Sequence, residues 1–284
     1  MPYIELNDIR IFYVLHKTSA TNKPGFVVLI HGVGGNHLSM LSIFNHIRKK
    51  YGKLFNILVF DLPCHFRSYL IACEADNATR LAIPISGGIN YYAKIINVFL
   101  KKLFGEYNTF ILIGHSMGAQ ICIKYASLFP HAVEKVMLIA GCHETRVRDD
   151  FIKSLEKSFN KTINIFLKDA LATKSKNVLN SALTDIKRTD PRITINDFRY
   201  VQYFSEHYDI DINHINAGKI FFDLICSRED KIVKYDCVAR LHRKIVNSEI
   251  HEINSENHMD FLYKNPSTEK EIDKFLLTRG MLKL

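Results

Sequence analysis

Residues 109–118 read Thr-Phe-Ile-Leu-Ile-Gly-His-Ser-Met-Gly, and this stretch decides the fold. The apolar run up to Ile113 is typical of a strand that is buried on both faces of a sheet, and residues 116–128 predict a helix directly after it. Between them, Gly114-His115-Ser116-Met117-Gly118 fits the pattern G-x-S-x-G. The two glycines permit a sharp strand-to-helix turn, with Ser116 on strained backbone at its tip. The sequence therefore predicts a nucleophilic serine at the end of a buried strand.

Strands and helices alternate on both sides of this turn. Further buried strands are predicted at 26–30, 55–60, 133–139, 219–226 and 249–253, and helices at 39–50, 89–104, 235–246 and 267–277. Such alternation indicates parallel βαβ units. A hairpin of residues 3–6 and 9–13 opens the chain. We therefore expect an α/β fold, with a mostly parallel eight-stranded sheet and helices on both faces.

Residues 143–214 depart from this alternation. Their apolar side chains take helical spacing and no strand is evident, so we interpret them as a helical cap inserted into a core of residues 1–142 and 215–284. Both connections of the insertion leave the carboxyl edge of the sheet, where the serine turn also opens. Six aromatic residues of the cap are candidates for lining a pocket over that turn: Phe151, Phe159, Phe166, Phe198, Tyr200 and Tyr203.

A serine hydroxyl needs a base to take its proton, and the base needs a carboxylate to fix its tautomer. His258 lies in a polar loop between the last strand and the last helix, at the expected carboxyl edge, and is the candidate base. Asp230 follows the strand that ends at Cys226, and we prefer it to its neighbour Glu229 as the acid. The order Ser, Asp, His is the one that this architecture requires.

An oxyanion hole needs two backbone donors that point at the developing negative charge. The Met117 amide directly follows the serine and is one candidate. The Val33 amide is the other, in the glycine-rich turn 31–35 after the first parallel strand. A phosphate-binding loop is the alternative for this turn, but neither G-x-G-x-x-G nor Gly-Lys-Ser/Thr is present.

Together these features resemble the α/β-hydrolase-fold serine hydrolases over nearly the full length. His31-Gly32-Val33-Gly34 is similar to the family's oxyanion turn, Gly114 to Gly118 to its nucleophile elbow, Asp230 to its acid and Asn257-His258 to its base. The elbow and cap are similar to those of small carboxylesterases, monoacylglycerol lipases and carbon–carbon bond hydrolases. The resemblance implies catalysis by Ser116, Asp230 and His258, with no metal or organic cofactor.

One loop departs from the family pattern. The family usually has Asp-x-x-Gly-x-Gly-x-Ser after the second parallel strand, whereas residues 61–68 here read Asp-Leu-Pro-Cys-His-Phe-Arg-Ser. If the positions of Cys64 and Phe66 require positive φ, we expect the loop to be rearranged. Residues 64–88 are expected to be irregular, and this stretch is long enough to form a second flap.

Composition and charge indicate which classes of partner and which compartment to expect. The formal net charge is +9, but no nucleic-acid motif is present, so we do not expect nucleic-acid binding. No apolar run approaches the roughly 18 residues of a membrane span, and the first residues lack a signal-peptide pattern. The six cysteines form no C-x-x-C pair, and we expect free thiols in a reducing cytoplasm: Cys64, Cys73, Cys122, Cys142, Cys226 and Cys237.

The expected function is hydrolysis of a small-molecule carboxylic ester, with a small to medium acyl chain, through an acyl-enzyme intermediate. Two alternatives use the same site: hydrolysis of a carbon–carbon bond, and hydrolysis of an acyl-carrier thioester or ester. Residues 153–192 carry nine basic and four acidic side chains, which keeps an acidic carrier open as a partner. A non-catalytic binding protein on this fold is disfavoured, because binding alone has no chemical need for the full set of catalytic residue types.

Overall fold

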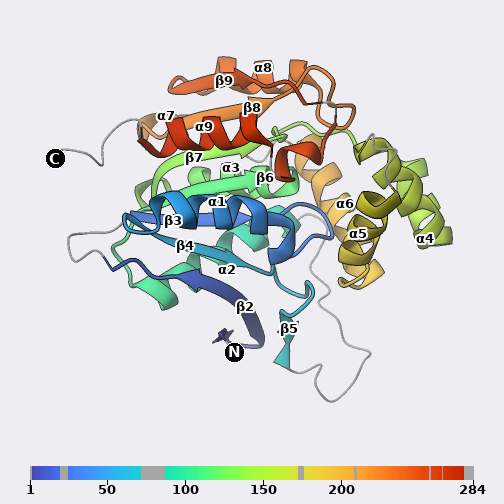
Figure 1. The fold of residues 1–284 in the computed structure, drawn as a ribbon, viewed down its shortest axis with the longest axis horizontal. Coiled ribbons are helices and arrows are strands. Elements are labelled where there is room, and N and C mark those ends of the chain that lie inside the picture. The colour runs from blue at the N-terminus through green and yellow to red at the C-terminus, as the bar shows by residue number, and fades with distance from the viewer. Residues whose placement is uncertain are drawn as a thin grey trace.

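The computed structural model describes residues 2–19, 25–71, 87–171, 176–207, 210–255, 257–263 and 265–277. Within these ranges nine strands form one sheet, in the order β1-β2-β4-β3-β6-β7-β8-β9, while β5 pairs with β2 (Figure 1). The β2 strand runs antiparallel to its neighbours, and all pairs from β4 to β9 along this order are parallel. The predicted mostly parallel sheet is therefore confirmed. The strands are β1 Tyr3–Leu6, β2 Ile9–His16, β3 Gly25–Ile30, β4 Phe55–Phe60, β5 Tyr69–Leu70, β6 Phe110–His115, β7 Val133–Ile139, β8 Phe221–Cys226 and β9 Ser248–Glu252.

Helices cover both faces of the sheet because side chains alternate along each strand. In β3, Val28 and Ile30 pack with α2 (Gly88–Phe104), α3 (Met117–Leu128) and α8 (Tyr235–Lys244). On the opposite face, Val27 and Leu29 pack with α1 (Leu41–Tyr51) and α9 (Pro266–Leu277), which lie in front of the sheet in Figure 1. Because both faces are apolar, the central strands read as continuous apolar runs rather than alternating ones.

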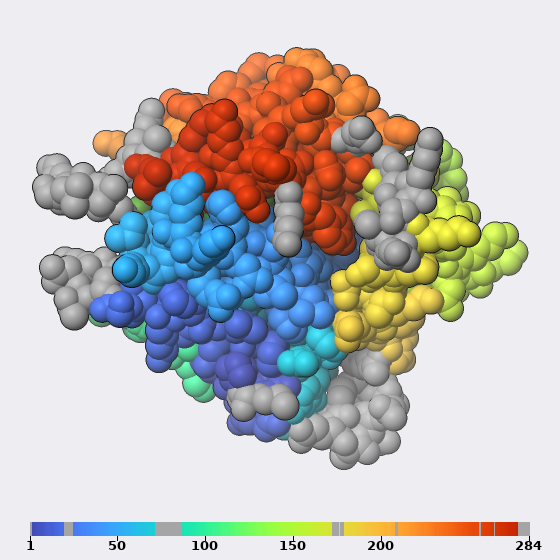
Figure 2. Space-filling view, viewed as in Figure 1, coloured from blue at the N-terminus to red at the C-terminus, as the bar shows by residue number. Residues whose placement is uncertain are grey.

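Four further helices lie between β7 and β8 in the chain: α4 Asp149–Leu171, α5 Lys176–Ile186, α6 Pro191–His207 and α7 Ile212–Ala217. Apolar residues of α4, α5 and α6 form a separate cluster around Leu155, Ile163 and Phe198. These three helices gather at one end of the molecule, beside the red segment that precedes α9 (Figure 1 and Figure 2). None of the described helices is both long and apolar enough to cross a membrane.

Two expectations require correction. Cys142, just after β7, and Cys237, in α8, form a disulfide, so the prediction that every cysteine is free is wrong. The bond escapes sequence reading because 95 residues separate the partners, and only the fold brings them together. The stretch 64–88 is also not wholly irregular, since it contains β5. Residues 72–86, which make up most of the expected second flap, lie outside the described residues.

Candidate active site

Ser116 occupies a strained turn between β6 and α3. Its backbone has φ 54° and ψ −117°, a combination that costs a residue with a side chain on the order of 1–3 kcal/mol. The neighbouring glycines allow the turn to pack closely. A Cβ on Gly114 would lie 2.3 Å from the Gly118 carbonyl oxygen, and one on Gly118 would lie 2.2 Å from the Ile30 carbonyl oxygen. The turn thus presses against the end of β3, and the serine side chain projects from its tip.

His258 joins this serine to a buried carboxylate. Its Nε2 lies 2.9 Å from Ser116 Oγ, and its Nδ1 lies 2.9 Å from Asp230 Oδ2. An ionised carboxylate only accepts, so Nδ1 carries a proton and donates it to Asp230, which leaves Nε2 to accept the serine proton. His258 and Asp230 are 3% and 2% exposed, so the chain of hydrogen bonds is shielded from water.

Asp230 is held in its ionised form. Burial alone raises the pKa of this carboxyl, but the hydrogen bond and electrostatic interaction with His258 outweigh burial, and the pKa is lowered overall. The amides of Ile232 and Val233 donate to Asp230 Oδ1 at 2.8 and 3.0 Å and lower the pKa further. Its neighbour Glu229 is exposed. Of the two carboxylates that the sequence offered, the structure therefore brings Asp230 into contact with His258.

Val33 and Met117 both line the same pocket as Ser116. Met117 is the first residue of α3, so its amide has no acceptor within the helix. For the part of the chain that the structure describes, no hydrogen-bond acceptor is found for either amide. The two amides therefore meet one condition of the predicted oxyanion hole, which needs backbone donors that are not already bonded.

The pocket above Ser116 has a volume of about 290 Å³ and a mostly apolar wall. Three of the six aromatic residues named from the sequence line it: Phe151, Phe166 and Phe198. Phe159, Tyr200 and Tyr203 do not appear in its wall, and Tyr200 instead packs against the start of α2 at Gly88. Apolar residues of the core, such as Met259, complete the wall.

Charged side chains also line this pocket, and the sequence analysis did not single them out. Among the described residues, Arg146, Arg148 and Lys231 contribute cations to the wall and Asp185 contributes a carboxylate, while Arg148 is also paired with Asp150. All three cationic residues are exposed, so they lie at the rim. The position of Lys231 directly after Asp230 is the one sequence signal that points to it.

The loop after β4 keeps positive φ without glycine. Cys64 and Phe66 have φ 65° and 40°, so the rearrangement expected for non-glycine residues at these positions is not needed. The Phe66 ring stacks on His37 at a centroid distance of 5.8 Å, and the Arg188 guanidinium lies 5.0 Å from its centre. Asp61 fixes the loop by accepting hydrogen bonds from the amides of His37 and Arg67. These contacts offset the cost of the left-handed conformation.

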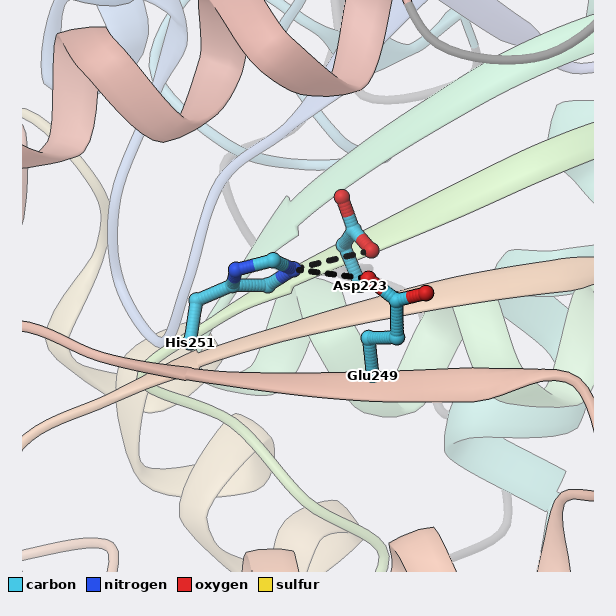
Figure 3. Close-up of side chains that lie close together, drawn as sticks. All are labelled: Asp223, Glu249 and His251. Atoms are coloured by element: carbon cyan, nitrogen blue, oxygen red, sulfur yellow. Dashed lines mark ion pairs between the residues drawn. The ribbon is translucent and has the colours of Figure 1, made fainter.

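One group of side chains has the residue types of a metal site. Asp223, Glu249 and His251, on β8 and β9, present ligand atoms within 4.8 Å of one another (Figure 3). The imidazole also lies 3.1 Å from Glu271. The Asp223 carboxylate, 3.1 Å from the ring, raises the pKa of His251 and favours the imidazolium, which cannot bind a metal. We therefore interpret the group as an ion-pair network that connects α9 to strands β8 and β9.

A model of the alpha/beta hydrolase fold family matches residues 25–265. The chain belongs to the alpha/beta hydrolase fold family. A Mycoplasma genitalium protein named putative esterase/lipase 2 is 26% identical over 156 residues, which are 52% of this chain and 52% of that protein. The chain thus matches only about half the length of that relative.

Two more proteins are similar over most of the chain. The uncharacterized hydrolase YugF of Bacillus subtilis is 24% identical over 245 residues, covering 82% of this chain and 83% of that protein. A solved structure from a study of carboxylesterases of Nitrososphaera gargenis superposes with a TM-score of 0.77 at 16% identity, covering 97% of both chains. At that identity the superposition shows the family's fold alone.

Proposed function

We propose that this protein is a serine hydrolase that cleaves carboxylic esters of small to medium acyl chain length. The observation that carries the proposal is the continuous hydrogen-bond chain from Asp230 through His258 to Ser116, which opens into a largely apolar pocket. Its geometry supplies an activated nucleophile and a base in the correct tautomer. The names of the Mycoplasma and Nitrososphaera proteins point to the same class of reaction.

Each residue of the site has a separate role in the proposed reaction. Ser116 Oγ attacks the carbonyl carbon of the ester while His258 Nε2 takes its proton, and Asp230 stabilises the resulting imidazolium. The amides of Val33 and Met117 bind the oxygen that becomes negative. His258 then gives the proton to the leaving alcohol, and an acyl-enzyme remains. Water repeats the sequence, with His258 as its base, and releases the carboxylic acid and free Ser116.

We further propose that residues 143–214 form a cap domain that determines the acyl chain length. Phe151, Phe166 and Phe198 provide an apolar wall, and their rings lie with centroids 5.0–5.6 Å apart. A wall of this kind excludes water from the acyl chain and strengthens the oxyanion interactions. It also limits the pocket to about 290 Å³, which suits a small or medium acyl group better than a long one.

A second candidate function is hydrolysis of an ester or thioester on an acidic acyl carrier. The observation that favours it is the cationic rim of Arg146, Arg148 and Lys231. Anionic groups outside the pocket would be attracted to these side chains, and the attraction would weaken with salt. Replacement of Lys231 by Gln would then reduce kcat/KM for an anionic thioester several-fold and leave a neutral ester unchanged.

A labelling experiment tests the first proposal. A fluorophosphonate probe should label the native protein at Ser116, and the label should be lost in Ser116→Ala. A panel of p-nitrophenyl esters, thioesters and diketones then assigns the reaction. Turnover of diketones in preference to esters would contradict the proposed ester hydrolase, and absence of labelling would contradict the serine mechanism itself.

A further inference from the structure

Asp197 is a fully buried carboxylate on α6 that bonds directly to the turn containing Val33. Its Oδ2 accepts the amide hydrogen of Gly34 at 2.8 Å, and its side chain has no exposed surface. Its Oδ1 accepts from the Tyr92 hydroxyl at 2.9 Å. A carboxylate is costly to bury unless its oxygens are satisfied and its charge is paired. The position of this group next to an oxyanion donor therefore requires an explanation.

The charge of Asp197 is paired with His65, from the loop that departs from the family pattern. His65 Nε2 lies 2.8 Å from Asp197 Oδ2, and His65 Nδ1 lies 3.1 Å from the Pro63 carbonyl oxygen. Both neighbours only accept hydrogen bonds, so both ring nitrogens carry protons and the imidazole is cationic. Burial lowers the pKa of His65, but the Asp197 carboxylate outweighs burial and the pKa is raised.

Other residues of the same helical segment hold the turn as well. Thr189 Oγ1 donates to the Gly35 carbonyl at 3.4 Å, and Asn36 Nδ2 donates to the Asp185 carbonyl at 3.3 Å. Gly34 has φ +59°, and a Cβ there would lie 2.7 Å from Thr194 Oγ1. The turn is therefore packed and hydrogen-bonded against α5 and α6. Of these contacts, the Asp197 bond is the shortest, the only charged one and the nearest to the Val33 amide.

We propose that Asp197 is a positioning residue: by binding the Gly34 amide it fixes the orientation of the preceding Val33 amide as an oxyanion donor. Asp197 does not line the pocket, whereas Val33 and Gly34 do, and the Gly34 and Val33 amides belong to adjacent peptide units. This inference rests on the proposed function. It links the docking of α6 to catalysis, since the oxyanion donor is correctly oriented only when the helix that contributes to the pocket wall is in place.

The chain offers a matched control for this role. Asp223 is also a buried aspartate paired with a histidine, His251, at 3.1 Å. It lies on β8, level with Ile113 of β6 across β7, and it does not line the pocket that contains Ser116. The substitutions Asp197→Asn and Asp223→Asn each remove one buried negative charge next to a histidine. Both are expected to lower Tm, but only the first should disturb the oxyanion turn.

Steady-state kinetics on a p-nitrophenyl ester measures the effect. Loss of an aligned oxyanion donor costs about 100- to 1,000-fold in kcat, and misalignment of a donor that is still present costs less. We expect Asp197→Asn to lower kcat about 10- to 100-fold with KM changed less than about threefold. Asp223→Asn should keep kcat within about threefold of the wild type. Equal kcat in the two variants would overturn the proposal.

A transition-state analogue separates positioning from stability. A trifluoromethyl ketone adds to Ser116 and places its oxygen, as an anion, in the oxyanion hole. Asp197→Asn should weaken its binding by the same factor as kcat/KM, while a loss of stability alone would leave the affinity of the folded fraction unchanged. An unchanged inhibition constant in folded Asp197→Asn would therefore also overturn the inference.

The variant His65→Gln provides a second route if Asp197→Asn does not fold. It removes the cation but leaves the Asp197–Gly34 bond in place, because a glutamine amide can still donate to Asp197 Oδ2. If Asp197 acts through the Gly34 amide, His65→Gln should lower Tm but keep kcat and the trifluoromethyl ketone inhibition constant within about threefold of the wild type. A loss in both as large as that expected for Asp197→Asn would contradict the proposal.

The same measurements distinguish this inference from the proposed function. If wild-type protein shows no ester turnover that depends on Ser116, the proposed function has failed. If the wild type is active and Ser116→Ala is inactive, but folded Asp197→Asn keeps full kcat, only the positioning role has failed.

Discussion

Ser116 Oγ and His258 Nε2 lie 2.9 Å apart, although 142 residues separate the two side chains in the sequence. Ser116 directly follows β6 and His258 follows β9, so both leave the sheet at the carboxyl ends of parallel strands. Four strands stand in the order β6-β7-β8-β9, and Asp230 follows β8, between them. A parallel sheet thus gathers three distant loops at one edge, which is where open α/β sheets bind their ligands.

The first prediction concerns Ser116. We expect Ser116→Ala to abolish covalent labelling and to lower kcat by roughly 10⁴ or more, because the remaining site has no nucleophile. The variant should fold normally, since alanine removes only an oxygen from the turn. Circular dichroism checks the fold, and ester hydrolysis checks the rate. Near-normal turnover by the variant would show that another residue is the nucleophile.

The second prediction compares two neighbouring carboxylates. Asp230→Asn should lower kcat by roughly 10²–10⁴, because an amide can donate to His258 Nδ1 and so favour the wrong tautomer. Glu229→Gln should change kcat little, since Glu229 is exposed. Parallel kcat measurements on the two variants show which carboxylate assists His258. The reverse ranking would show that Asp230 is not the acid.

The third prediction concerns acid stability. Burial lowers the pKa of His31 to about 4 and that of His115 to about 3, so both stay neutral in the folded protein. Below their unfolded pKa of about 6.5, the unfolded chain binds protons that the folded chain does not. As the pH falls from 6 towards the folded pKa, each histidine therefore lowers the free energy of unfolding by about 1.4 kcal/mol per pH unit.

Urea unfolding between pH 7 and pH 5 measures this slope. His65 and His251 have raised pKa values, so they stabilise the folded protein as the pH falls and offset part of this slope. The variant His115→Asn should therefore reduce the average slope over this range by about 1 kcal/mol per pH unit relative to the wild type. An identical slope in the two proteins would mean that His115 is not buried in its neutral form.

The fourth prediction concerns the disulfide. Cys142 and Cys237 connect the end of β7 to α8, directly after the Asp230 loop, and close a large loop of chain. We expect Cys142→Ser to lower the free energy of unfolding by about 2–4 kcal/mol under oxidising conditions. Cys122→Ser changes a buried cysteine that is free and serves as the comparison for dithiothreitol sensitivity. Six titratable thiols in the unreduced, denatured wild type would contradict the bond.

Much of the fold could be predicted because the signals are local. Continuous apolar runs such as 110–113 mark strands that are buried on both faces, and G-x-S-x-G marks the turn between one of them and its helix. The carboxyl-edge rule then named Asp230 and His258, which the structure brings into contact with Ser116. Each of these inferences needed only a short window of sequence and the direction of the strands.

The rest depended on contacts between distant segments. Asp197 reads as an ordinary polar residue on an amphipathic helix, and only packing shows that it meets His65, 132 residues away. Cys64 and Phe66 replace expected glycines, yet stacking and loop hydrogen bonds hold them at positive φ. Phe159 and Phe166 both read as apolar residues of one predicted helix, but α4 is kinked at Ser158, directly before Phe159, and only Phe166 lines the pocket.

That difference gives the fifth prediction, because Phe159 and Phe166 lie on one helix and differ in what they contact. Both pack against the apolar cluster of α4, α5 and α6, but Phe166 also lines the pocket and Phe159 does not appear in its wall. Phe166→Ala should enlarge the acyl pocket and shift the kcat/KM optimum towards p-nitrophenyl esters that are longer by several carbons. Phe159→Ala, the control, should lower Tm without moving the optimum. Equal profiles in the two variants, or a wild-type preference for emulsified long-chain triglycerides, would show that the wall at Phe166 does not determine the acyl chain length.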